Sequence, residues 1–120
     1  MAVAAVFFLT PPPANNAPLI ATLGAEGGPL VFEARYDGAA LTVARVSGPV
    51  AGAGKVHELW IIAPEAAPVS LGLLGDEPLS VPYPMPPAGW ILAVSLEPSG
   101  GSTTGAPTGP VLASGPVTDL

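Results

Sequence analysis

Residues 30–46 read LVFEARYDGAALTVARV, and this stretch decides the fold class. Its two halves alternate between apolar and polar side chains, as strands with one buried face do, and an Asp-Gly pair stands between them. In the first half, Phe32 and Tyr36 share one face, while Glu33 and Arg35 share the other. The stretch therefore predicts an antiparallel hairpin with Glu33 and Arg35 on its solvent face.

Similar short runs continue on both sides of this hairpin. The 120 residues include 15 glycines and 17 prolines, yet 49 % are hydrophobic and only 10 % are charged. So many turn-formers in so apolar a chain indicate short strands joined by turns rather than disorder. The runs expected to be strands are 19–23, 30–36, 40–46, 57–63, 70–74, 79–81, 90–96 and 111–114. We predict an all-β fold, an antiparallel β-sandwich of about seven or eight short strands, either Ig-like or a partly closed barrel.

The N-terminal residues differ in character from the rest. Residues 2–9 are wholly apolar, and residues 10–18 read TPPPANNAP. Eight helical residues would span only about 12 Å of a hydrocarbon core about 30 Å thick. We interpret 1–9 as the outer end of a transmembrane helix and 10–18 as an extended Pro-rich spacer before the sandwich domain at 19–120. The alternative for 1–9 is a first β-strand or a docked apolar segment.

Charge and residue inventory exclude several kinds of function. The chain has no cysteine, three basic residues and a net charge of −6, so disulfides, thiol chemistry and nucleic-acid binding are not expected. His57 is the single histidine and no G-x-S-x-G motif occurs, so no catalytic site is predicted. We expect His57 on the surface of a sheet. Its neighbour Glu58 points to the opposite face, so the two cannot chelate one metal ion, and no metal or cofactor is expected.

Two other features have a structural and a functional interpretation. Trp60 and Trp90 lie inside hydrophobic runs, which predicts that they fill the core. On a surface they would instead form a stacking platform for cell-wall glycan in an exported binding or adhesion module. After Glu97 comes a loop rich in Gly, Ser, Thr and Pro, and the carboxylate is expected to accept hydrogen bonds from its amides.

Several segments, taken in order, resemble one known family. They are HELW at 57–60, PVSLG at 68–72, AVSLEPSGGS at 93–102, PTGP at 107–110 and SG at 114–115. Together they resemble the extracytoplasmic C-terminal domain of anti-sigma-K factors over residues 19–117. In the family an aromatic residue and an amide usually precede Leu-Trp, where this chain has His57 and Glu58. The positions that match the motifs, to which we assign a structural role, are Leu59, Trp60, Ser70, Leu71, Gly72, Ser95, Glu97, Pro98, Gly100, Gly101, Ser102, Pro107, Thr108 and Gly109.

The resemblance implies a non-catalytic regulatory domain outside the cytoplasmic membrane. It belongs to a single-pass anti-sigma factor that controls an extracytoplasmic-function sigma factor through regulated proteolysis. The sigma factor would bind an N-terminal domain that is absent from this sequence, and the membrane contact would be a helix that is largely absent. An extracytoplasmic protease and an unidentified signal protein are the implied further partners. No catalytic, cofactor-binding or metal-binding residue carries over from the family.

Overall fold

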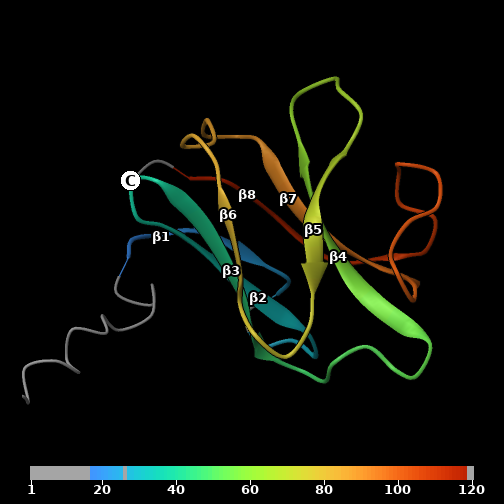
Figure 1. The fold of residues 1–120 in the computed structure, drawn as a ribbon. Helices are drawn as coiled ribbons and strands as arrows, with labels where there is room; N and C mark the ends of the chain where they lie inside the picture. The colour runs from blue at the N-terminus through green and yellow to red at the C-terminus, as the bar shows by residue number, and fades with distance from the viewer. Residues whose placement is uncertain (1–16, 26, 119–120) are drawn as a thin grey trace, which may run out of the picture.

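The computed structural model describes residues 17–25 and 27–118, which form eight β-strands (Figure 1). The apolar segment predicted at 1–9, and the spacer before residue 17, lie outside the described residues. The strands are β1 (Leu19–Leu23), β2 (Val31–Tyr36), β3 (Ala40–Ser47), β4 (Lys55–Ile62), β5 (Val69–Leu74), β6 (Leu79–Pro82), β7 (Ile91–Pro98) and β8 (Val111–Pro116).

The strands form two four-stranded sheets. Sheet A has the order β1-β2-β3-β6, sheet B has the order β5-β4-β7-β8, and all neighbouring strands are antiparallel. Figure 1 shows the two sheets as separate layers, with β1, β2, β3 and β6 in one and β4, β5, β7 and β8 in the other. The predicted antiparallel β-sandwich is therefore confirmed.

The hairpin read from residues 30–46 is β2–β3. The Asp37 amide donates to the Ala40 carbonyl over 3.3 Å, which makes Gly38 and Ala39 the two central residues of the turn. Gly38 has φ +100°, a value that glycine adopts without strain. The Asp37 carboxylate accepts the Ala39 and Ala40 amides at 2.8 Å, and these bonds lower the pKa of Asp37 below its ordinary value. The predicted hairpin thus gains a side-chain cap for its turn.

The core lies between the inner faces of the two sheets. Alternation along each strand turns every second side chain inward, and the inward residues of β1, β2, β3, β4 and β7 are buried almost completely. Burial of each such side chain stabilises the fold by about 1.5–3 kcal/mol. The largest fully buried members of this cluster are Phe32, Ile20, Leu23, Leu41, Leu59 and Leu92.

One lateral side of the sandwich is closed by contacts between β1 and β8. The Gly24 amide donates to the Ser114 carbonyl over 3.0 Å, and the Thr118 amide donates to the Ile20 carbonyl over 2.8 Å. The backbones approach so closely that a Cβ atom on Gly115 would lie 2.0 Å from the Thr22 carbonyl oxygen. The first and last strands therefore join the two sheets along this side.

The structure corrects the expected position of His57. The side chain is 4 % exposed and meets the Phe32 ring edge-on at a centroid distance of 5.7 Å, so it lies inside the sandwich and not on a sheet surface. The reason is parity, because His57 shares the inward face of β4 with Leu59. Burial, and secondarily the charge of Arg45, lower the pKa of His57.

Candidate functional site

The outer face of sheet B carries a cluster of buried polar side chains. Parity places Glu58 and Trp60 of β4, with Ser95 and Glu97 of β7, on the face turned away from the core. Glu58 is 6 % exposed and the other three are 0 % exposed. Buried polar groups require hydrogen-bond partners, and here many of these come from the 99–110 loop.

The first part of the cluster is a relay between neighbouring strands. The Trp60 indole N–H donates to Ser95 Oγ over 2.9 Å, and Ser95 Oγ donates to Glu97 Oε2 over 2.6 Å. The serine hydroxyl thus accepts one bond and donates another. Both the indole and the carboxylate are fixed in direction by the same side chain.

Glu97 also holds the far end of the loop. Its carboxylate accepts the Thr108 amide (3.1 Å to Oε2), the Thr108 hydroxyl, and the Gly109 amide over 3.4 Å. Burial alone would raise the pKa of Glu97, but the hydrogen bonds from Ser95, Thr108 and Gly109 outweigh it and leave the pKa below its ordinary value. Glu97 is therefore ionised and holds the loop. The contact predicted from the sequence, between this carboxylate and the loop amides, is present in the structure.

Glu58 holds the near end of the same loop. Its Oε1 accepts the Ser102 amide over 2.7 Å, and its Oε2 accepts the Ser70 hydroxyl of β5 over 2.5 Å. Sequence reasoning gave Glu58 no role in holding the loop. The signal that could have found it is its place on the same strand face as Trp60, since an acid there needs buried donors.

Glycines allow the loop to lie close to the sheet. A Cβ atom on Gly109 would stand 1.8 Å from the Leu96 carbonyl oxygen. Gly100 and Gly101 have φ of +94° and +97°, which lets the chain turn back from β7 toward Glu58. We call residues 99–110 the clamped loop, because two buried carboxylates hold its two ends.

The remaining predicted positions lie on the strands of sheet B or in the clamped loop. Leu59 lies in the inter-sheet core, Leu71 packs against it, and Gly72 lies beside Leu79. Pro98 ends β7, and Pro107 precedes the two amides bound by Glu97. The structure brings Trp60, Ser70, Ser95, Glu97, Gly101, Ser102, Thr108 and Gly109 together around the two carboxylates, while Leu59, Leu71 and Gly72 lie apart from them.

The two tryptophans differ in position. Trp60 is buried as predicted, but on the outer face of sheet B rather than between the sheets, because parity pairs it with Glu58 and not with Leu59. Trp90 is half-buried and packs against the core. Trp60 in this conformation presents no face on which a sugar ring could stack.

The chemistry available to the cluster is internal hydrogen bonding. Within residues 17–25 and 27–118, every buried side-chain nitrogen and oxygen has a partner. The same residues contain no group of three or more His, Asp or Glu side chains placed to hold a metal ion. An open pocket of about 540 Å³ lies on sheet A, and Glu33, one of its lining residues, is paired with Arg35. Among the residues that the structure describes, no helix is long and apolar enough to cross a membrane.

Comparison with protein families decides what kind of domain this is. The model described as "Anti-sigma-K factor rskA, C-terminal" matches residues 1–111, which include all strands up to the start of β8. The chain belongs to this family. The resemblance read from the sequence motifs is thereby confirmed, and every residue of the clamped loop lies within the matched range. Comparison with curated proteins and with solved structures finds no significant match.

Membership in the anti-sigma-K C-terminal family assigns the chain a regulatory role. An anti-sigma factor acts on a sigma factor, so the family implies a sigma factor as the partner.

Proposed function

We propose that this chain is the extracytoplasmic, non-catalytic domain of a membrane-anchored anti-sigma factor, and that its folded state controls proteolytic release of the sigma factor. The observation that carries the proposal is the match to the anti-sigma-K C-terminal family over residues 1–111. The sigma factor binds a domain outside this sequence. The membrane anchor includes residues 1–9, and residues 10–18 connect the anchor to the sandwich.

The arrangement of β1 supports a protective role for the fold. β1 is paired with β2 along one edge, and the Gly24 amide and Ile20 carbonyl at its two ends bond to residues at and just beyond β8. Proteases and other peptide-binding proteins commonly take their peptides as extended strands with free backbone groups. While the sandwich is folded, the edge of β1 that faces β2, the Ile20 carbonyl and the Gly24 amide are already bonded within the protein and are not free to pair with a protease. Loss of the folded state exposes the connection between anchor and domain to a first cut.

The saturated polar cluster supports a non-catalytic role. His57, the one histidine, is buried against Phe32, and both buried carboxylates accept hydrogen bonds from the protein itself. A general base needs access to the proton that it removes, and none of these groups has it in the folded sandwich. The domain therefore works through its stability and its surface.

The test measures cleavage of the full-length protein in reconstituted membranes. Leu59→Ala removes a fully buried core side chain and should cost about 2–5 kcal/mol of stability. Leu112→Ala makes the same chemical change at an exposed position. We expect faster cleavage between anchor and sandwich in the Leu59 variant only, measured by N-terminal mapping of the fragments. Equal rates in wild type and the Leu59 variant would refute the proposal.

A further inference from the structure

The chain enters the sandwich through two carbonyl groups that are both held by β2. The Pro18 carbonyl accepts the Tyr36 amide over 3.0 Å, which extends the β1–β2 ladder by one bond. The Ala17 carbonyl accepts Nη1 of Arg35 over 2.9 Å, which is a side-chain contact beyond the end of the ladder. Arg35 therefore lengthens the paired segment past the point where backbone pairing stops.

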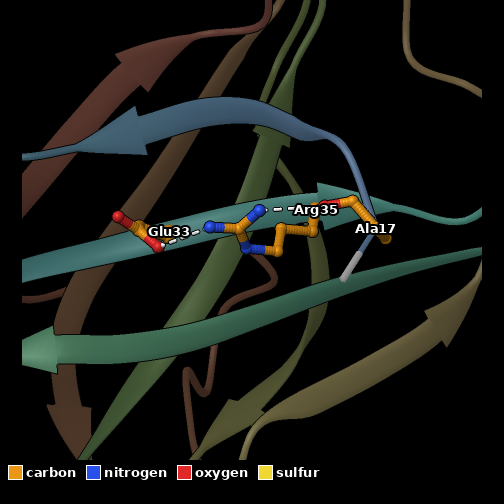
Figure 2. Close-up of polar contacts among 3 residues, drawn as sticks. All are labelled: Ala17, Glu33 and Arg35. Carbon is orange, nitrogen blue, oxygen red and sulfur yellow. Dashed lines mark hydrogen bonds and ion pairs between the residues drawn. The ribbon is translucent and has the colours of Figure 1, made fainter. Parts of the chain in front are cut away.

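The guanidinium is held in place from its other side. Its Nη2 donates to Glu33 Oε1 over 3.2 Å, and Figure 2 shows the group lying between the Glu33 carboxylate and the Ala17 carbonyl. Both side chains are about one-third exposed, so the pair lies on the outer face of sheet A and not in the core. A planar guanidinium can serve two acceptors at once in fixed directions, which a lysine ammonium does less well.

We propose that Arg35 is a positioning residue that sets the limit of protease access at the start of the sandwich. While the Ala17 carbonyl is bound, the chain from this residue onward cannot pair with a protease cleft, so cleavage is confined to bonds that precede it. Release of the guanidinium extends the accessible segment toward β1. The inference rests on the proposed function for its biological meaning, but its geometry concerns this chain alone.

The expected size of the effect follows from the kind of bond. A charged hydrogen bond at a partly exposed position contributes modestly, so its loss should raise the open population of the 17–20 segment by roughly three- to tenfold. When opening is fast relative to cleavage, the rate of proteolysis follows that population. Glu33→Gln weakens the orientation of Arg35 and should produce a smaller rise in the same direction.

The experiment uses the purified 120-residue chain and proteinase K under native conditions, with cut sites mapped by mass spectrometry. Arg35→Gln should speed cleavage at bonds between residues 16 and 21, and Arg35→Lys should have an intermediate effect. Arg45→Gln is the matched control. This substitution removes the same charge, but Arg45 bonds to the Gly48 and Gly75 carbonyls and not to Ala17. Equal cleavage in the Arg35→Gln and Arg45→Gln variants would overturn the inference.

Hydrogen exchange distinguishes local opening of the 17–20 segment from a general loss of stability. In the Arg35→Gln variant the Tyr36 amide, which bonds to Pro18, should exchange about three- to tenfold faster. The amide of Leu59 in β4 should keep its wild-type rate. An equal rise in the exchange rates of both amides would mean global unfolding and would contradict the proposed role of Arg35. Since no membrane, sigma factor or cellular protease takes part, this result is independent of the test of the proposed function.

Discussion

At the scale of single residues, the decisive feature is a pair of glutamate side chains on the buried outer face of sheet B. Glu58 and Glu97 each accept backbone amides from the clamped loop and hydroxyl groups from neighbouring residues. A carboxylate suits such a site because it offers only acceptors, and every group that surrounds it here is a donor. Glutamate is therefore suited to both positions, because its side chain accepts the hydrogen bonds that the loop amides donate.

Glu97→Gln tests this directly. Glutamine has the same shape but replaces one acceptor oxygen with an NH₂ group, which then faces the hydroxyls and amides of Ser95, Thr108 and Gly109. We expect a loss of about 1–3 kcal/mol in the free energy of unfolding, with faster amide exchange at 108 and 109. Glu77→Gln, at an exposed position, should leave both measurements unchanged. Wild-type exchange at Thr108 in the Glu97 variant would contradict the clamp.

At the scale of elements, the clamped loop lies so close to β7 that its backbone fits only without a side chain at one point. The amide of Leu96 donates to the Pro110 carbonyl over 3.0 Å, and Gly109 passes directly over the Leu96 carbonyl. The loop is therefore fixed by backbone contact as well as by the carboxylates. Gly109 permits this close approach, whereas Gly100 and Gly105 have positive φ values and open space at the Cβ position.

Gly109→Ala should displace the loop from the sheet. The added Cβ atom would stand 1.8 Å from the Leu96 carbonyl oxygen, and both partners of this clash are backbone atoms or bonded directly to backbone. Overpacking of this kind typically costs about 1–3 kcal/mol, which urea unfolding would measure. Gly52→Ala is the matched control, since its Cβ would meet nothing within 4 Å. Equal stability of the two variants would show that the loop does not pack as described.

At the scale of the whole molecule, the two sheets depend on their shared edge and on buried ionisable groups. β1 and β8 come from opposite ends of the described chain, so the closed side forms only when the whole sandwich is folded. His57 lies between the sheets, while Glu97 lies under the clamped loop. Stability should therefore respond to pH at two separate places in the molecule.

The sign of this response follows from the direction of each pKa shift. The pKa of His57 is lowered by burial, so folding favours its neutral form and stability declines as pH falls below about 6.5. The pKa of Glu97 is also lowered, so the stability it contributes is present above pH 4.5 and is lost as pH falls through its folded pKa. The pKa of Asp37 is lowered as well, so the stability that it contributes is lost as pH falls below 3.8.

Urea unfolding at pH 7.5, 5.5 and 3.5 would measure the losses of stability assigned to His57 and to Glu97. We expect a decline in stability from 7.5 to 5.5 that disappears in His57→Gln, and a further decline to 3.5 that is smaller in Glu97→Gln. Each variant serves as the control for the other, because the two side chains lie on opposite faces of sheet B. Stability that rises on acidification would contradict both assignments.

Residue patterns on their own were sufficient for the fold class and most strand positions. Alternation along 30–46 predicted the β2–β3 hairpin, and the apolar run at 57–63 predicted a strand, which is β4 between β5 and β7. The pattern failed for His57, which was expected on a sheet surface and instead lies between the sheets. Depth depends on what the opposite sheet places there, in this case Phe32.

A sandwich of short strands and membership among anti-sigma-K C-terminal domains could be predicted from the residues alone, because alternation and short ordered motifs are local properties. The folded arrangement was needed to find that Trp60 is buried on the outer face, that Glu58 shares the loop with Glu97, and that Arg35 bonds to Ala17. Each of these contacts joins residues from 18 to 44 positions apart. Which residues meet depends on the strand order and on where the loop folds back over the sheet. A local sequence pattern predicts neither of these.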